Sequence, residues 1–290
     1  MTLVPPTDGL RVAKYASGAG YAPEQWARAL AAVDWGEAEL LSDKPTSSVW
    51  RAGLVVQKRP MTLVIKCEPI DSLKRTVQKL ARRTHAFRHW RGAELLMKHG
   101  FRTAAPKAIV YGRRDGVEIE CLIMEALAGE SLLRTIAERE LGVRDEHRLA
   151  REVGKLIAMM IQKRIVNADP KPSNIMLTNN AGTIELGFVD TVGVKQHTTF
   201  LPGFEAVDDA DVWFMLRDLL LEPMGIGRPV RRALAMRTLR EIWGGKGGSD
   251  WRAWRNAWWE QVATLVRAHG DPTPEHNPLG PASGTRPERE

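Results

Sequence analysis

Three side chains that together suit phosphoryl transfer lie in the segment 166–177 (VNADPKPSNIML). Asp169, Lys171 and Asn174 supply a carboxylate, a cation and a carboxamide at positions i, i+2 and i+5. In phosphoryl transfer, a carboxylate orients the attacking hydroxyl and accepts its proton, a cation balances charge on the moving group, and an amide oxygen holds Mg²⁺. The alternative interpretation is a polar turn, rich in Asn, Asp and Pro, that joins a helix to a strand.

A second carboxylate follows at a distance that a hairpin would close. The run 178–182 (TNNAG) predicts a turn, and 183–189 (TIELGFV) predicts a strand that returns and ends at Asp190. Such a hairpin brings Asp190 back beside Asn174, as a pair of Mg²⁺ ligands requires. The alternative for Asp190 is a residue that ends a strand and begins a turn.

These two segments resemble the catalytic loop of the protein-kinase-like superfamily, H-x-D-x-K-x-x-N, and the Asp of its D-F-G triplet, which reads Asp-Thr-Val here. The resemblance implies that Asp169 is the catalytic base and that Lys171 contacts phosphate. It also implies that Asn174 and Asp190 are the metal ligands.

Strands of a small antiparallel sheet are predicted upstream, at 47–52 and 61–67. The second strand ends in Val-Ile-Lys, which resembles the V-A-I-K strand of kinases, whose Lys contacts the α- and β-phosphates. Lys66 is therefore a candidate nucleotide ligand, the alternative being a solvated residue at the edge of a strand. The usual Gly-rich phosphate loop is missing. Ser47 and Ser48 stand in its place and either offer donors to phosphate or simply begin the strand.

The segment from Ser72 to His99 predicts one long basic helix that stops at Gly100, with five candidate core positions. Kinases pair the strand Lys with a Glu on this helix. Glu94 is the compositional candidate, although the spacing to the end of the helix would place the family Glu nearer His89. The candidate core positions are Leu80, Phe87, Trp90, Leu95 and Leu96.

A strand at 117–124 leads into a segment, 124–132 (MEALAGESL), that resembles a kinase hinge. Extended backbone at Met124, Glu125 and Leu127 would bind adenine through its N–H and C=O groups, and Glu130 would reach the ribose. The alternative is a plain turn from strand to helix. Beyond it, a helix from Asp145 with an apolar face delivers the chain to the catalytic segment.

The composition indicates a globular protein with a local excess of positive charge. The 290 residues carry a formal net charge of +7, and between Arg51 and Arg114 there are 16 Lys and Arg against three acids. Such a field favours an anionic partner: nucleotide phosphates, acidic lipid headgroups or a phosphorylated sugar, with nucleic acid the weaker choice. The alternative is a solvated basic face with no partner. Cys67 and Cys121 lie in apolar runs without metal-ligand spacing, which favours buried free thiols in a cytoplasmic protein.

The C-terminal part contains five of the ten tryptophans, between Trp243 and Trp259. Their helical spacing favours core packing over a membrane interface. The predicted organisation is a flexible N-terminus (1–20), an N-lobe (21–125), a C-lobe (126–270) and a Pro-rich disordered tail (271–290).

From residue 48 to about 193, and more loosely to 270, the chain resembles the bacterial lipopolysaccharide kinase family, which phosphorylates Kdo or heptose with ATP and Mg²⁺. The R-x-W-x-x-A-x-x-L-x-x-x-G pattern from Arg88 to Gly100 supports this branch. The resemblance implies an α+β, two-lobed kinase-like fold, with a small antiparallel-sheet N-lobe and a mainly helical C-lobe. It implies the cofactors ATP and Mg²⁺, an anionic glycolipid or sugar acceptor, and peripheral contact with the inner membrane.

Two departures from the kinase pattern leave alternatives open. Asn167 stands where the family has His, and Thr191-Val192 replaces Phe-Gly, although neither change removes a group that touches phosphate or metal. The alternatives are a kinase of the same fold that acts on protein or another small alcohol, and a pseudokinase that binds nucleotide, or nothing, and acts as a scaffold.

Overall fold

The computed structural model describes residues 3–17, 21–180, 183–197, 209–246, 251–274 and 278–279. These residues form two compact units, which are described separately. Of the described residues, the first contains those in 3–93, 104–126 and 278–279, and the second contains those in 94–103 and 127–274. The predicted lobe boundary between residues 125 and 126 falls one residue before this division.

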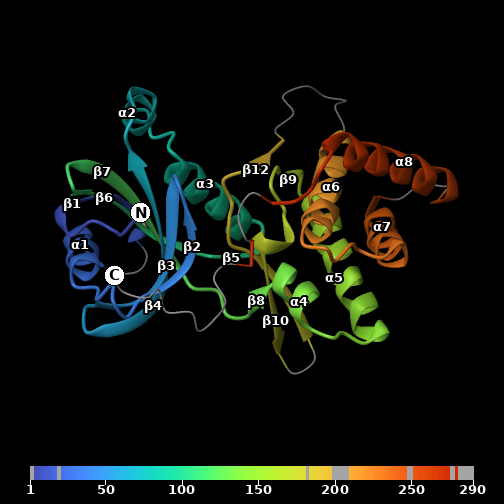
Figure 1. Ribbon diagram of the computed structural model, residues 1–290, viewed down its shortest axis with the longest axis horizontal. Coiled ribbons are helices and arrows are strands. Elements are labelled where there is room, and N and C mark those ends of the chain that lie inside the picture. Colours follow the sequence, from blue (N-terminus) through green and yellow to red (C-terminus); the bar gives the residue numbers. More distant parts are fainter. Residues whose placement is uncertain are drawn as a thin grey trace. The chain divides into compact units, whose positions relative to one another are not determined.

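The first unit is built on a six-stranded sheet in which every neighbouring pair of strands is antiparallel. Helix α1 (Pro23–Ala31) packs on the sheet through Trp26 and Leu30, both fully buried (Figure 1). Along β3, alternate residues from Ser48 to Val56 are buried, because successive side chains of a strand point to opposite faces. The strands in spatial order are β1 (Asp8–Tyr15), β6 (Pro106–Arg114), β7 (Val117–Glu125), β4 (Arg59–Ile70), β3 (Ser47–Val56) and β2 (Glu39–Lys44).

The N-terminal segment is more ordered than the sequence predicts. The prediction of a flexible stretch over residues 1–20 is wrong for Asp8–Tyr15, which forms β1 and pairs with β6. The alternation of apolar and polar residues along this strand is weak, so the local sequence gives little sign of it. The strand pairs instead with β6, about 100 residues away in sequence. Most of the predicted tail lies outside the described residues.

Cys67 and Cys121 form a disulfide rather than two free thiols, so the prediction of free thiols is wrong. The two residues face each other in the antiparallel register of β4 and β7, with their Cα atoms 4.3 Å apart. Directly opposed residues of antiparallel strands come this close. The two residues are separated by 54 positions in sequence, and this spacing gave no sign of that register.

The predicted long basic helix is two helices. Ser72 caps α2 (Leu73–Leu80) by accepting a hydrogen bond from the backbone of Arg75, and α3 (His85–Lys98) follows after a break. Arg82 has a φ of 52°, a conformation incompatible with a continuing α-helix. Phe87, Trp90 and Leu96 are buried and Leu95 is partly buried, as predicted, but Leu80 is 80% exposed, so the prediction of a core position there is wrong.

The second unit is mainly helical, with its small sheets gathered around the segment 165–196. Its core helix α5 buries the predicted apolar face, from Leu149 to Ile161. In the described part of the chain, none of the helices is both long and apolar enough to cross a membrane. The sheets are β5 (Arg102–Thr103), β11 (Thr183–Phe188), β10 (Ile175–Asn180) and β8 (Glu130–Ser131), and separately β12 (Val194–Gln196) with β9 (Ile165–Asn167); the helices are α4 (Leu132–Glu138), α5 (Val143–Gln162), η2 (Pro172–Asn174, a 3₁₀ turn), α6 (Asp209–Gly225), α7 (Arg232–Lys246) and α8 (Trp251–His269).

Four of the five tryptophans of α7 and α8 pack on one another, as the helical spacing favoured. Trp254 stacks on Trp258 with ring centroids 4.2 Å apart, and Trp243 contacts Trp251 and Trp254. Trp258 is almost completely buried in the core of the second unit.

Gly129, just before β8, lies directly against the backbone of β10. Its φ is +104°, and a Cβ there would overlap the carbonyl of Leu177. We expect Gly129→Ala to lower the free energy of unfolding by about 2–4 kcal/mol, from backbone strain and steric overlap together. Gly227 is the matched control, because its φ is +73° and an added Cβ meets nothing within 4 Å. Gly227→Ala should lose about 1–2 kcal/mol. Equal losses in urea unfolding would contradict the close approach.

Candidate active site

The catalytic segment brings its three predicted side chains into direct contact. Asp169 follows β9, and Asn174 ends the 3₁₀ turn that leads into β10. The Lys171 ammonium lies 3.0 Å from Oδ1 of Asp169, and Nδ2 of Asn174 donates to the carbonyl and to Oδ2 of Asp169 at 3.1 and 3.3 Å. The Asp169 and Lys171 side chains are each about half exposed (45% and 48%), so both can be reached by a substrate.

The backbone of this loop is fixed from two sides. The backbone N–H of Ala168 donates to the carbonyl of Gly193 at 3.1 Å, and β9 pairs with β12, Asn167 opposite Val194. Gly193 approaches so closely that a Cβ there would lie 3.1–3.2 Å from atoms of Ala168 and Asp169. A short glycine-dependent contact thus ties the segment after Asp190 to the catalytic loop.

Asn167, where kinases have His, braces the loop in a different way. Its side chain is fully buried, and Oδ1 accepts a hydrogen bond from the backbone N–H of Asp169 at 3.1 Å. The carboxamide therefore holds the residue two positions on, as an Asx turn does. This replacement leaves the Asp169 backbone supported.

Asp190 reaches the loop through the predicted hairpin. Strands β10 and β11 pair in register from Ile175–Phe188 to Asn180–Thr183, and the tip of the turn (181–182) lies outside the described residues. The N–H of Val189 donates to the carbonyl of Asn174 at 3.0 Å, so the two predicted metal ligands come from adjacent backbone at the open end of the hairpin. Oδ1 of Asp190 accepts from the N–H of Val192.

The donor set fits Mg²⁺, which in phosphoryl-transfer sites takes one or two protein oxygens and completes its shell with phosphates and water. Because Nδ2 of Asn174 is turned to Asp169, the amide oxygen Oδ1 is the atom left for a metal. No group of three or more His, Cys, Asp or Glu suited to hold a metal ion occurs among the described residues. A metal held by Asn174 and Asp190 would therefore depend on nucleotide phosphates.

Two acids of α6 that the sequence did not single out complete the loop's surroundings. Glu222 accepts from the backbone N–H and from Oγ of Ser173, at 2.8 and 2.5 Å. Asp218 is buried and paired with Arg217. These acids lie four residues apart in the otherwise apolar end of the helix, residues 218–225, and that spacing was the available signal.

The charges of this cluster shift one another's pKa. Burial raises the pKa of Asp218 and of Glu222, and the nearby Asp169 carboxylate raises both further. Arg217 lowers the pKa of Asp218 and hydrogen bonds from Ser173 lower that of Glu222, but the net direction is upward for both. Burial lowers the pKa of Lys171, but Asp169, Glu222 and Asp218 together raise it, and the net direction is upward. Lys171 therefore stays a cation, as charge stabilisation requires.

In the first unit, Lys66 lies beside a carboxylate on its own strand. Its ammonium is 3.9 Å from Oε1 of Glu68, which also contacts Arg75 and His85. Burial raises the pKa of Glu68, but His85, Lys66 and Arg75 outweigh it, so the pKa is lowered and the carboxylate stays ionised. Glu94, the predicted partner of Lys66, is exposed on α3, and that pairing stays a prediction.

Lys66 and Glu68 line a small cavity with a buried histidine. The cavity has a volume of about 10 Å³ and also contacts His89 and Glu120. His89, the position where the spacing placed the family Glu, is 1% exposed. The two carboxylates that line this cavity, Glu68 and Glu120, thus come from strands β4 and β7 rather than from helix α3.

The two serines predicted to bind phosphate differ in their surroundings. Ser48 is fully buried; its hydroxyl donates to the carbonyl of Leu3 and accepts from the indole of Trp50. Its hydroxyl hydrogen is therefore not available to a phosphate, which corrects the prediction for the Ser48 hydroxyl. Ser47 pairs with Lys44 across the tight turn that joins β2 and β3, and it is partly exposed.

The hinge-like residues are partly committed to other contacts. Met124 is buried at the end of β7, and the N–H of Glu125 donates to the carbonyl of Ala105 at 2.9 Å. The Glu125 N–H is thus not available to adenine, which corrects that part of the prediction. In the second unit, Leu127 is half-buried, and Oε1 of Glu130 accepts from Thr135 and pairs with Arg139 at 2.6 Å.

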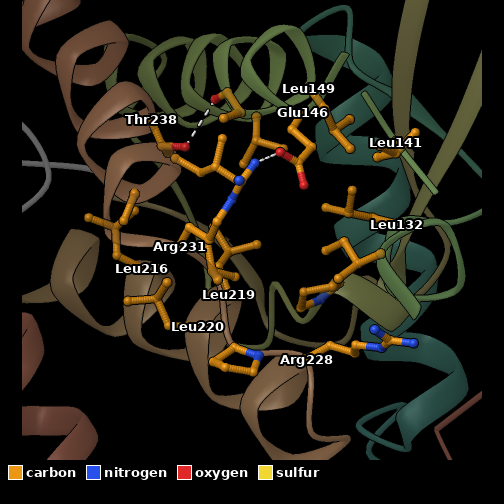
Figure 2. A pocket seen from close by; sticks show the side chains of 18 of the residues that line it. Leu132, Leu141, Glu146, Leu149, Leu216, Leu219, Leu220, Arg228, Arg231 and Thr238 are labelled. Atoms are coloured by element: carbon orange, nitrogen blue, oxygen red, sulfur yellow. Dashed lines mark hydrogen bonds and ion pairs between the residues drawn. The ribbon is translucent and has the colours of Figure 1, made fainter. Parts of the chain in front are cut away.

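A larger cavity, of about 620 Å³, lies among the helices of the second unit. Figure 2 shows its mostly apolar wall, with Leu132, Leu216 and Leu219 around it and an ion pair between Arg231 and Glu146. Of the catalytic loop, Pro172 lines it. The cavity wall is mostly apolar, so the groups suited to phosphoryl transfer are those of the loop itself.

The elements of the two units, a wholly antiparallel sheet in the first and a helical second unit with a loop–hairpin site, define a protein of the kinase-like fold. A solved structure described as "WaaP in complex with acyl carrier protein" has a TM-score of 0.53 to this chain at 15% identity, over 80% of this chain and 87% of that chain. At this identity the likeness establishes the fold, which confirms the predicted α+β kinase-like architecture.

The sequence itself matches the model of the "Lipopolysaccharide kinase (Kdo/WaaP) family" over residues 70–196. The matched range includes Asp169, Lys171, Asn174 and Asp190 but not Lys66. Over these residues the chain is similar to that family, in agreement with the resemblance, and the similarity indicates a kinase, a phosphotransferase with a hydroxyl acceptor. A search of the curated proteins finds no match.

The anchoring of Ser173 makes Glu222 a positioning residue for the loop. Glu222→Ala leaves the partly buried N–H and hydroxyl of Ser173 without their acceptor, so we expect a loss of about 1–3 kcal/mol in the free energy of unfolding and a fall in kcat. Glu222→Gln keeps an acceptor oxygen and should restore most of both. Glu185→Ala, at a half-exposed carboxylate on β11, is the control and should change neither. Unchanged kcat in Glu222→Ala would contradict the positioning role.

Proposed function

We propose that this protein transfers the γ-phosphoryl group of ATP to a hydroxyl of a lipopolysaccharide core sugar, Kdo or heptose, with the help of Mg²⁺. The observation that carries the proposal is the Asp169–Lys171–Asn174 contact set in one anchored loop. The family match supports a kinase of the lipopolysaccharide core. The choice between Kdo and heptose rests on the family resemblance alone.

Each loop residue has a distinct proposed role. Asp169 orients the acceptor hydroxyl and accepts its proton, and Lys171 balances charge on the phosphoryl group as the bond to the leaving phosphate breaks. Asn174 and Asp190 would hold Mg²⁺, which when bound neutralises phosphate charge. The exposure of Asp169 and Lys171 is consistent with contact to an incoming sugar.

The nucleotide contacts are proposed in the first unit and at the start of the second. Lys66, kept oriented by Glu68, would contact the α- and β-phosphates, with Ser47 as a further donor. Leu127 would face adenine and Glu130 the ribose. Glu94 remains a proposed second partner for Lys66.

Nucleotide binding is the first test. Lys66→Ala removes a charge-assisted phosphate contact, which contributes about 1.5–3 kcal/mol, so the Kd for ATP with Mg²⁺ should rise roughly 10- to 100-fold in calorimetry. Lys58→Ala, in the exposed turn between β3 and β4, is the matched control and should bind as the wild type does. No binding by the wild type at millimolar ATP would contradict both the kinase and the nucleotide-dependent scaffold.

The second test separates chemistry from metal binding. Asp169→Asn removes the base but keeps the metal ligands, so kcat should fall by about 10²–10⁴ while the Kd for ATP changes little. Asp190→Asn should instead shift the Mg²⁺ dependence of activity to higher concentration. If Asp169→Asn keeps full ATP-dependent transfer to a core-sugar acceptor, the catalytic assignment is wrong.

A further inference from the structure

Helix α2 is amphipathic, but it turns its apolar side away from the protein. Leu73, Val77 and Leu80 are 81%, 56% and 80% exposed. At spacings of i, i+4 and i+7 they form one stripe along the helix. None of the residues of α2 is buried. Figure 1 shows the helix standing beyond the end of β4, from which it follows.

The opposite side of α2 is held to the sheet by cations. Arg75 donates to the carbonyl of Pro69 at 2.7 Å and contacts Glu68 of β4 at 3.4 Å. Lys79 pairs with Glu118 of β7 at 2.5 Å, and its ammonium lies 4.6 Å from the ring centre of Tyr111. These contacts fix the rotation of the helix, because turning the apolar stripe inward would break them. The outward stripe is therefore built into the fold.

Exposed cations border the stripe. Lys74, Arg82 and Arg83 are exposed on α2 and just after it, and Arg88 and Arg91 are exposed on α3. From Ser72 to Arg91 the sequence contains no Asp or Glu. Apolar side chains flanked by Lys and Arg match the helices that lie in the interface of a bilayer, with the cations among anionic headgroups.

We infer that α2 docks this protein on an anionic bilayer surface, with Leu73, Val77 and Leu80 entering the interface. The choice of a bilayer rests on charge complementarity, and on the proposed function, whose acceptor is part of a membrane glycolipid. The rotation set by Arg75 and Lys79 would point the stripe at the membrane without any refolding. The Trp-rich helix α8 is a poorer candidate, because Trp254 and Trp258 are packed in the core.

Flotation of the full-length chain with vesicles tests this inference. The vesicles are phosphatidylcholine alone, or phosphatidylcholine with about one-third phosphatidylglycerol. We expect binding to the anionic vesicles that weakens with added salt, since exposed charges are screened over about 8–10 Å at physiological ionic strength. The double variant Leu73→Ser/Leu80→Ser should lower the partition coefficient about tenfold or more. Its residues are exposed, so the fold should persist.

Matched variants make the outcome specific to α2. Val55→Ser/Val143→Ser changes two side chains that are each 62% exposed elsewhere, and it should bind as the wild type does. Arg82→Gln/Arg83→Gln should weaken binding to anionic vesicles and remove part of its salt dependence. Wild-type partitioning by the Leu73/Leu80 variant, or no vesicle binding by the wild type, would overturn the inference and point to a protein partner for the stripe.

The vesicle experiment needs neither nucleotide nor turnover, so it fails independently of the proposed function. A variant that loses vesicle binding but keeps its Kd for ATP supports docking by α2. If the Leu73/Leu80 variant loses both vesicle binding and ATP binding and has a lowered Tm, its fold is impaired. The Arg82/Arg83 variant, whose changed side chains are also exposed, then decides: weaker binding to anionic vesicles supports docking by α2, and wild-type binding contradicts it.

Discussion

The candidate site depends on backbone pairing that joins the two ends of the segment 165–196. Strand β9 pairs with β12, and the hairpin β10–β11 returns the chain so that Val189 bonds to Asn174. Between these ladders, Ala168 bonds to Gly193. The loop with Asp169 is therefore closed on itself by main-chain hydrogen bonds. This is a rigid frame for side chains that are themselves half exposed.

The frame places charges in an arrangement that costs stability and suits catalysis. Burial raises the pKa of Asp218 and of Glu222, and repulsion from the Asp169 carboxylate adds to the rise in both. Lys171 offsets part of this repulsion. Partly buried like charges are unfavourable for folding, and such clusters are typical of functional sites. In the first unit, the carboxylate beside Lys66 is Glu68 on the same strand, whereas kinases pair this Lys with a Glu on a helix.

The sequence predicted what depends on neighbouring residues. The Asp–Lys–Asn spacing, the hairpin to Asp190 and the apolar face of α5 are local patterns, and the structure has all three. It did not predict what depends on distant pairing. The Cys67–Cys121 disulfide requires the β4–β7 register, and the Ser48 hydroxyl donates to the carbonyl of Leu3, 45 residues away. Leu80 was assigned to the core because helical periodicity shows that a stripe exists and not which way it faces. Glu222 was missed because its partner lies 49 residues away.

The most direct test of the account is a crystal structure of the chain with a non-hydrolysable ATP analogue and Mg²⁺. The account predicts a metal bound by Oδ1 of Asn174 and a carboxylate oxygen of Asp190 at about 2.0–2.1 Å, with phosphate oxygens completing the shell. It further predicts Lys171 beside the terminal phosphate and Lys66 beside the α- and β-phosphates. A metal held by other residues, or a nucleotide bound away from Asp169 and Lys171, would contradict it.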